Sequence, residues 1–159
     1  MSLLLLRGSQ YRRAGGPAAP VPWIDIECRG LATPEAVACI EAGSRAYNAD
    51  LMPRNEAPLH LVVRSDGREV VAGLLATTGW RMLEVSSLWV RDALRCLGLG
   101  SRLLHEAEAQ ARRRGCAWAA ADGFSFQAIG FFVRAGYHAY AVLPGYSMNQ
   151  ARHLMRKRL

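Results

Sequence analysis

The segment of residues 88–115, LWVRDALRCLGLGSRLLHEAEAQARRRG, constrains the fold more than any other part of the chain. Its pattern predicts a strand over residues 83–90, a sharp turn at Gly98 and Gly100, and one amphipathic helix to about residue 114. The first turn of a helix leaves four N–H groups unpaired and carries partial positive charge. Arg95 adds a permanent charge, so the segment predicts a seat for a phosphate-bearing ligand.

Two well-known phosphate motifs are excluded here. A P-loop ends in Lys followed by Ser or Thr, but the chain contains a single lysine, Lys157. A dinucleotide fingerprint requires a third small residue, and Leu103 occupies that position. A tight strand-to-helix turn that binds nothing remains the alternative.

The pattern Arg95-x-x-Gly98-x-Gly100, placed after an apolar strand, resembles the acetyl-CoA loop of the GNAT family of N-acetyltransferases. Residues 131–137, FFVRAGY, resemble the same family's Leu/Phe-Tyr-x-x-x-Gly-Phe/Tyr helix end. The resemblance covers about residues 23–159 and implies acetyl-CoA as the acetyl-donor cosubstrate. It implies that the cofactor is bound by Leu88, Trp89, Val90, Arg95, Cys96, Leu97, Gly98, Leu99, Gly100, Ser101, Ser125 and Phe132.

Periodicity and turn residues predict an α/β (α+β) domain around a mixed central sheet flanked by helices, in the order β-α-β-β-β-α-β-α-β-β. This order is also that of the GNAT fold. Residues 1–20 are expected to form a disordered leader, and residues 21–159 a single domain. Asp66-Gly67 is expected to supply positive φ angles in a hairpin turn. Strands are predicted at residues 23–29, 59–64, 69–78, 81–90, 116–121, 137–142 and 147–159, and helices at 34–47, 98–114 and 125–135.

Composition narrows the class of protein. Of the 159 residues, 51% are hydrophobic, enough for a sizeable core, yet no apolar run approaches the ~20 residues of a membrane span. We therefore expect a cytoplasmic protein without a membrane partner. The net charge is +7, but solvated faces explain this better than nucleic-acid binding, which we do not expect. The four cysteines form no C-x-x-C pair, so no metal site is expected. The sequence does not decide whether the protein forms a homodimer.

The resemblance also implies a chemistry, in which an amine attacks a thioester carbonyl. The strand before the glycine turn is expected to splay from its parallel neighbour at a bulge, leaving the Val90 N–H free for the acetyl oxygen. Glu84, eleven residues before Arg95, is the candidate general base, with a pKa raised by its apolar strand. A strand glutamate that faces solvent or pairs with an arginine is the alternative.

The proton donor and the acceptor site are less defined. Many GNAT enzymes use a tyrosine as the acid, but Phe132 stands at that position. Tyr137, Tyr140 and Tyr146 are substitutes with stronger structural roles, and Ser125 stands where the family often has an asparagine that contacts the cofactor. The resemblance places the amine of a small molecule or peptide near Tyr47, Asn48 and Asp50.

Three functions follow from these observations. The first is an acetyl-CoA-dependent N-acetyltransferase, and the second a catalytically silent module that binds or senses acyl-CoA, because Phe132 lacks a proton. The third, a basic nucleic-acid-binding protein, is suggested by net charge alone.

Overall fold

The computed structural model describes residues 30–49 and 55–159. The chain divides into two units, residues 1–45 and 46–159, which are described separately. The predicted strand at residues 23–29 and the predicted leader lie outside the described residues. No helix in the described ranges is long and apolar enough to cross a membrane.

Helix α1 spans Pro34–Ala49 and contributes most of the described part of the first unit. Its start follows the sequence closely, because the Thr33 hydroxyl accepts the N–H of Ala36 at 3.3 Å and Pro34 occupies the first helical position. The helix continues two residues beyond the predicted end. Tyr47 and Asn48, predicted at the end of the helix and the start of a loop, therefore both lie in its last turn.

Three antiparallel strands open the second unit: β1 (Ala57–Arg64), β2 (Val70–Gly79) and β3 (Met82–Val90). The β1–β2 turn is closed by the N–H of Arg68 on the carbonyl of Ser65 at 2.8 Å. The positive φ of this turn falls on Arg68, at 62°, and not on Asp66 or Gly67, so the predicted placement is wrong. A turn of ordinary handedness followed by one left-handed residue joins the strands instead.

Helix α2 (Leu99–Arg113) follows a short 3₁₀ turn, η1 (Asp92–Leu94), and returns the chain to β4 (Trp118–Phe124). Strand β4 pairs parallel with β3, so the predicted βαβ crossover is confirmed. Strand β4 begins two residues later than predicted, because the N–H of Cys116 still bonds to the carbonyl of Ala111 in the helix. Its buried residues alternate with partly buried ones, and within this strand only Asp122 is exposed.

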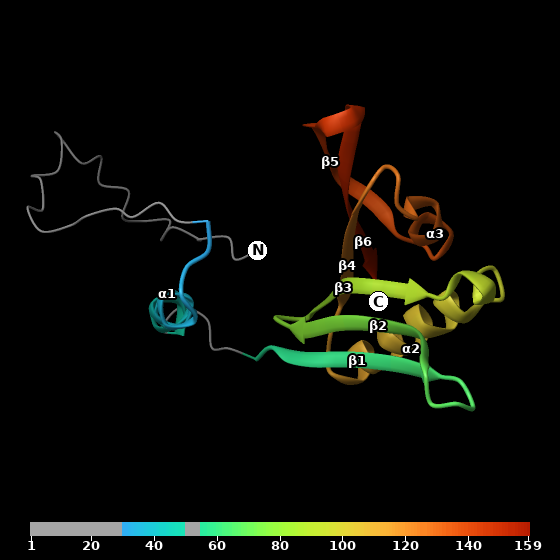
Figure 1. The fold of residues 1–159 in the computed structure, drawn as a ribbon, viewed down its shortest axis with the longest axis horizontal. Helices are drawn as coiled ribbons and strands as arrows, with labels where there is room; N and C mark the ends of the chain where they lie inside the picture. The colour runs from blue at the N-terminus through green and yellow to red at the C-terminus, as the bar shows by residue number, and fades with distance from the viewer. Residues whose placement is uncertain (1–29, 50–54) are drawn as a thin grey trace, which may run out of the picture. The chain divides into compact units, whose positions relative to one another are not determined.

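The chain ends with α3 (Ile129–Arg134), β5 (His138–Tyr146), a second 3₁₀ turn η2 (Ser147–Asn149), and β6 (Gln150–Arg158). Helix α3 is shorter than predicted, since the stretch before it forms a turn held by the Gln127 side chain on the N–H of Phe124 at 2.7 Å. The sheet order is β1-β2-β3-β4-β6-β5, a mixed sheet flanked by helices as predicted. Strands β4, β5 and β6 run steeply across the direction of β1, β2 and β3 (Figure 1).

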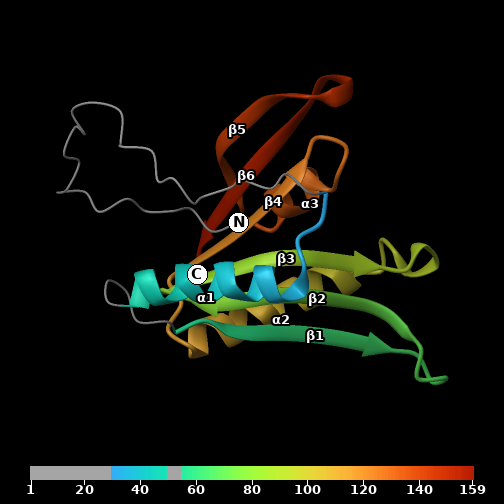
Figure 2. The same cartoon turned by 60° about the vertical axis from the view of Figure 1, so that its left-hand side comes forward.

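The core of the second unit lies between the sheet and α2, which packs on one face of β1, β2 and β3 (Figures 1 and 2). Its side chains include Leu74, Leu83, Leu104 and Met155, all nearly inaccessible to solvent. One charged group is also buried there: Glu108 of α2 is 2% exposed, and both of its oxygens contact the Lys157 ammonium, at 2.9 and 2.7 Å. This ion pair joins α2 to β6.

Candidate active site

The sheet opens between its two parallel strands. Strand β3 pairs with β4 only as far as Val85 and Ala121, although both strands continue beyond these residues. A bulge lies at the same point, because Val85 faces Ala76 of β2 while Ser87 faces Leu75, which leaves Ser86 as the extra residue. The predicted splay at a bulge is therefore present in the structure.

The inner edge of β3 presents unpaired backbone groups to this opening. Arg91 N–H donates to Val71 O at 2.9 Å, so these two residues form a hydrogen-bonded pair. Bonded and non-bonded pairs alternate along an antiparallel ladder, so the N–H groups of Val90 and Leu88 point away from β2, towards the opening. The Val90 N–H therefore has the direction that its predicted role requires. Trp89, whose N–H faces β2, can contact a ligand there only through its half-exposed side chain.

The turn after β3 leads directly into an uncapped helix. Gly98 occupies the N-cap position of α2 with φ of +82°, and no side chain caps the helix there. Throughout residues 55–159, no acceptor bonds to the N–H groups of residues 97–101. Such a row of free amides at the positive end of a helix has the electrostatic character that favours binding of an anion.

Arg95 lies at the entry to this turn, and its guanidinium group already bonds to two nearby groups of the chain. Its Nε donates to Val90 O at 3.1 Å, and an η nitrogen contacts Asp92 Oδ1 at 2.6 Å. Cys96 next to it adopts a left-handed φ of 61°, which is uncommon for a residue with a side chain. The turn is thus shaped by Arg95 as well as by its glycines.

Glu84 lies on β3 one residue before the last pair with β4, and its side chain is exposed. The expectation of an apolar environment is wrong, because the strand alternates: Leu83 and Val85 face the core, and Glu84 faces the opposite side. Glu84 thus faces solvent, as one form of the alternative expected, and no ion pair involving it occurs among residues 30–49 and 55–159.

Phe132 packs edge-to-face against Tyr137 with ring centroids 5.4 Å apart. Tyr137 is 2% exposed, and burial raises the pKa of its hydroxyl, with the charge of Glu108 adding to the rise. A buried phenol with a raised pKa donates its proton less readily, which argues against Tyr137 as the replacement for the missing tyrosine. Tyr140 and Tyr146 are both partly exposed on β5.

Ser125, predicted to contact a cofactor, already has partners on β6. Its hydroxyl lies 3.1 Å from His153 Nε2 and donates to Ala151 O at 3.2 Å. His153 is a residue that sequence reasoning did not select, because it is 28 positions away and no local motif joins it to Ser125.

A second pair that the sequence did not reveal lies at the beginning of the opening. Arg152 Nε donates to Asp122 Oδ2 at 2.6 Å, and this bond raises the pKa of the already cationic guanidinium. Of the predicted acceptor residues, Tyr47 and Asn48 belong to α1, and Asp50 lies outside the described residues.

Comparison with known proteins identifies this architecture. The sequence profile described as the Acetyltransferase (GNAT) family matches residues 27–137. The chain is 41% identical to Blasticidin-S acetyltransferase of Streptomyces morookaense over 92 residues, covering 57% of this chain and 68% of that protein. It is 32% identical to Acetyltransferase Atu2258 of Agrobacterium fabrum over 129 residues, covering 80% and 94%. A crystal structure of a candidate acetyltransferase from Agrobacterium tumefaciens superposes with a TM-score of 0.81 at 29% identity, covering 86% and 100%.

The family match and the two named relatives therefore identify the chain as an acyltransferase. The chain belongs to the GNAT family of acetyltransferases, as the resemblance implied. Members of this family use acetyl-CoA as the acetyl donor.

The residues present fit this donor. The free N–H groups of residues 97–101 match the several acceptor oxygens of a diphosphate. A Cβ at Gly98 would meet no atom within 4 Å, so the space in front of the turn is open. A Cβ at Gly100 would make ordinary contacts with Phe131 at 3.4 Å and Val90 at 3.8 Å, so packing within the protein does not itself require glycine there.

Proposed function

We propose that this GNAT acetyltransferase transfers the acetyl group of acetyl-CoA to a primary amine of a small molecule or peptide by direct attack. One observation carries the proposal: β3 and β4 separate at Val85 and Ala121, and the Val90 N–H faces the gap they leave. A thioester lying along this edge would have its carbonyl oxygen within reach of that donor.

The chain's own residues then have separate tasks. The amides of residues 97–101 bind the diphosphate, and the Val90 N–H stabilises the charge that develops on the acetyl oxygen. One such donor typically contributes ~3 kcal/mol to the rate. Glu84 acts as the general base through a water molecule, since a protonated amine cannot attack.

The departing thiolate receives its proton from the incoming amine or from water. Phe132 has no proton to give, and the buried Tyr137 hydroxyl holds its proton too tightly. No covalent enzyme intermediate is part of this proposal, because direct attack requires none.

The relative from Streptomyces morookaense favours a small molecule over a peptide as the acceptor, since its name specifies blasticidin S. The two proteins share 41% identity over more than half of this chain. We therefore place blasticidin S first among the acceptors to be tested, ahead of polyamines, aminoglycosides, amino acids and peptide N-termini.

The test is release of free thiol from acetyl-CoA in the presence of each amine. We expect turnover that depends on one of the amines, and acetyl-CoA should raise the melting temperature of the protein. A melting temperature that rises without any turnover would favour the silent acyl-CoA-binding module. Absence of both responses would contradict the proposed function.

A further inference from the structure

Asp122 stands at the point where the two parallel strands separate. It follows Ala121, the last β4 residue paired with β3, so it is the first β4 residue beside the opening. Because Ala121 and its β6 partner Met155 face the core, Asp122 projects from the opposite face of the sheet. Glu84 shares this face, since its partner on β4 is Ala120.

Arg152 orients the Asp122 carboxylate. Its Nε contacts only the Oδ2 oxygen, at 2.6 Å, and no residue in the described ranges bonds to Oδ1. The side chains are 42% exposed for Asp122 and 28% exposed for Arg152. A carboxylate accepts hydrogen bonds through both oxygens, so Oδ1 is available to an N–H donor from outside the chain.

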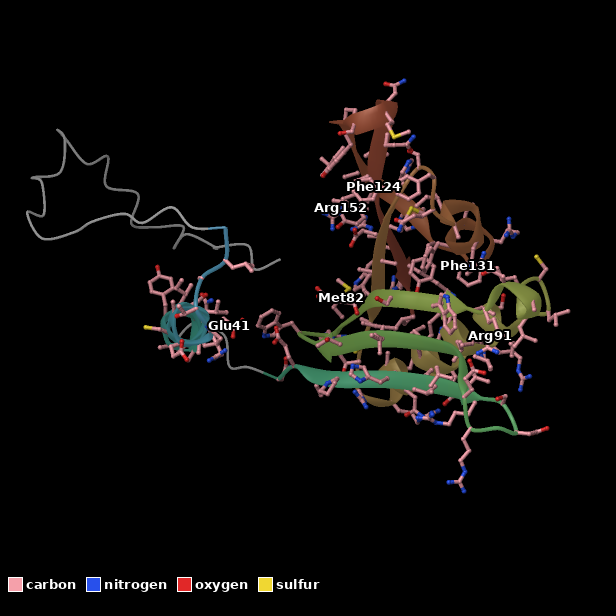
Figure 3. The ribbon with its side chains drawn as sticks, viewed as in Figure 1. Glu41, Met82, Arg91, Phe124, Phe131 and Arg152 are labelled. Carbon is pink, nitrogen blue, oxygen red and sulfur yellow. The ribbon has the colours of Figure 1, made fainter. Side chains whose placement is uncertain are left out.

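Aromatic rings continue this face outward from the carboxylate. Phe124 lies two residues after Asp122 and meets Tyr146 edge-to-face at 4.9 Å between centroids. Phe126 stacks parallel to Phe124 at 5.7 Å. Figure 3 shows Phe124 and Arg152 close together where β4, β5 and β6 rise away from β3. Aromatic faces beside a carboxylate favour a planar, N–H-rich, cationic group.

We infer that Asp122, held by Arg152 and flanked by Phe124 and Tyr146, is the carboxylate that recognises the acceptor and sets the specificity for a cationic small-molecule amine. The inference rests on the proposed function, because it names the substrate class for that same site. Asp122 binds the acceptor, whereas Glu84 acts on the attacking amine.

A purely structural role is the competing explanation. The Asp122–Arg152 pair joins β4 to β6, but seven residue pairs already connect these strands, from Trp118 with Arg158 to Phe124 with Arg152. Partly exposed ion pairs contribute little to stability. The structural explanation predicts a small loss of stability on removal of the pair and no effect on the acceptor.

The experiment compares Asp122→Asn with Glu106→Gln in the full chain. Glu106 forms a similar partly exposed ion pair with Arg113 at 3.2 Å, on α2. Steady-state kinetics are measured with blasticidin S, or with the best amine of the panel, at several salt concentrations. We expect Asp122→Asn to raise the KM for the acceptor by about tenfold, as expected for loss of a charge-assisted hydrogen bond. The KM for acetyl-CoA and kcat should change by less than about twofold.

Salt dependence separates recognition from structure. The wild-type KM for a cationic acceptor should rise with ionic strength, and this rise should be weaker in Asp122→Asn because one attracting charge is gone. Glu106→Gln should match the wild type in every measurement. An unchanged KM and unchanged salt dependence in Asp122→Asn would overturn the inference, as would a loss confined to kcat.

Two further outcomes keep the proposals distinct. If the wild type acetylates no amine, the proposed function fails before Asp122 is tested. If Asp122→Asn does not fold, Phe124→Leu replaces it, with an expected rise of several-fold in the KM for the acceptor and none for acetyl-CoA. An acceptor KM that Phe124→Leu leaves unchanged would then overturn the inference.

Discussion

Both ends of α2 have a glycine in the left-handed conformation, but the hydrogen bonding around these two glycines differs. Gly98 and Gly115 both adopt a left-handed φ, at +82° and +80°, and a Cβ at either would meet nothing within 4 Å. At the C-terminal end the chain satisfies its own groups, with Gly115 N–H on Arg112 O and Cys116 N–H on Ala111 O, both at 2.9 Å. At the N-terminal end the N–H groups of residues 97–101 have no acceptor within residues 55–159. The unmet hydrogen bonds, and not the left-handed glycine, therefore distinguish the candidate binding end of the helix from its other end.

The largest expected effect concerns Glu108, in the C-terminal half of α2. Glu108→Ala leaves Lys157 without its partner beside the core, so the free energy of unfolding should fall by about 3 kcal/mol. The control is Glu106→Ala, whose exposed pair with Arg113 should be worth less than ~1 kcal/mol. Urea denaturation measures the free energy of unfolding of both variants. Equal losses would show that the buried pair contributes no more to stability than the exposed pair.

The next prediction concerns β3, the strand that leads into the N-terminal end of α2. Glu84→Gln should lower kcat/KM by about 100-fold, as expected for removal of a general base, with little change in acetyl-CoA affinity. Because the side chain is exposed, the melting temperature should remain within the error of the wild type. The two substitutions would then have distinct effects: the one at Glu84 lowers the reaction rate, and the one at Glu108 lowers the stability. Unchanged turnover and an unchanged pH profile would remove Glu84 from the mechanism.

The third prediction tests the two glycines against each other. Gly98→Ala and Gly115→Ala place a Cβ in the left-handed region, so each should destabilise the protein by about 1–2 kcal/mol. Only Gly98→Ala should also weaken acetyl-CoA binding, by about tenfold, because it reorients the amides of the turn. Calorimetric titration measures this affinity. Equal weakening in both variants would mean that the effect comes from stability alone.

The smallest effect is expected at Tyr137. Its hydroxyl is buried beside Glu108 but outside strict hydrogen-bond geometry, so Tyr137→Phe should change stability at neutral pH by about 1 kcal/mol or less. The folded-state pKa is raised above the unfolded value of about 10. The wild type should therefore lose stability as the pH rises above about 10, while Tyr137→Phe loses less. Parallel denaturation curves at pH 7 and pH 10.5 test this, and identical alkaline losses would contradict it.

The features predicted correctly from sequence are those with local signals. Gly98, Gly100 and the helical spacing of Leu103 and Ala107 lie within one short segment, and together they located the turn, the helix and the crossover. Glu108 and Arg112, four residues apart on the same helix, also pair at 3.6 Å, as their spacing in the sequence favours. Local periodicity suffices for these because each depends on residues a few positions apart.

The features that were missed depend on strand register. Lys157 contacts Glu108 across 49 residues, and Arg152 contacts Asp122 across 30. Only the order β4-β6-β5 brings these residues together, and no local pattern encodes that order. Glu84 was misplaced for a related reason: its apolar neighbours suggested burial, whereas strand alternation turns it to the other face.

The central claim is that the main-chain amides of residues 97–101 bind the diphosphate of acetyl-CoA. A crystal structure of the protein with coenzyme A tests it most directly. We expect diphosphate oxygens within hydrogen-bond distance, about 3 Å, of at least two of these N–H groups, with the thiol end in the gap between β3 and β4. A diphosphate bound elsewhere, with these amides in contact only with solvent, would contradict it.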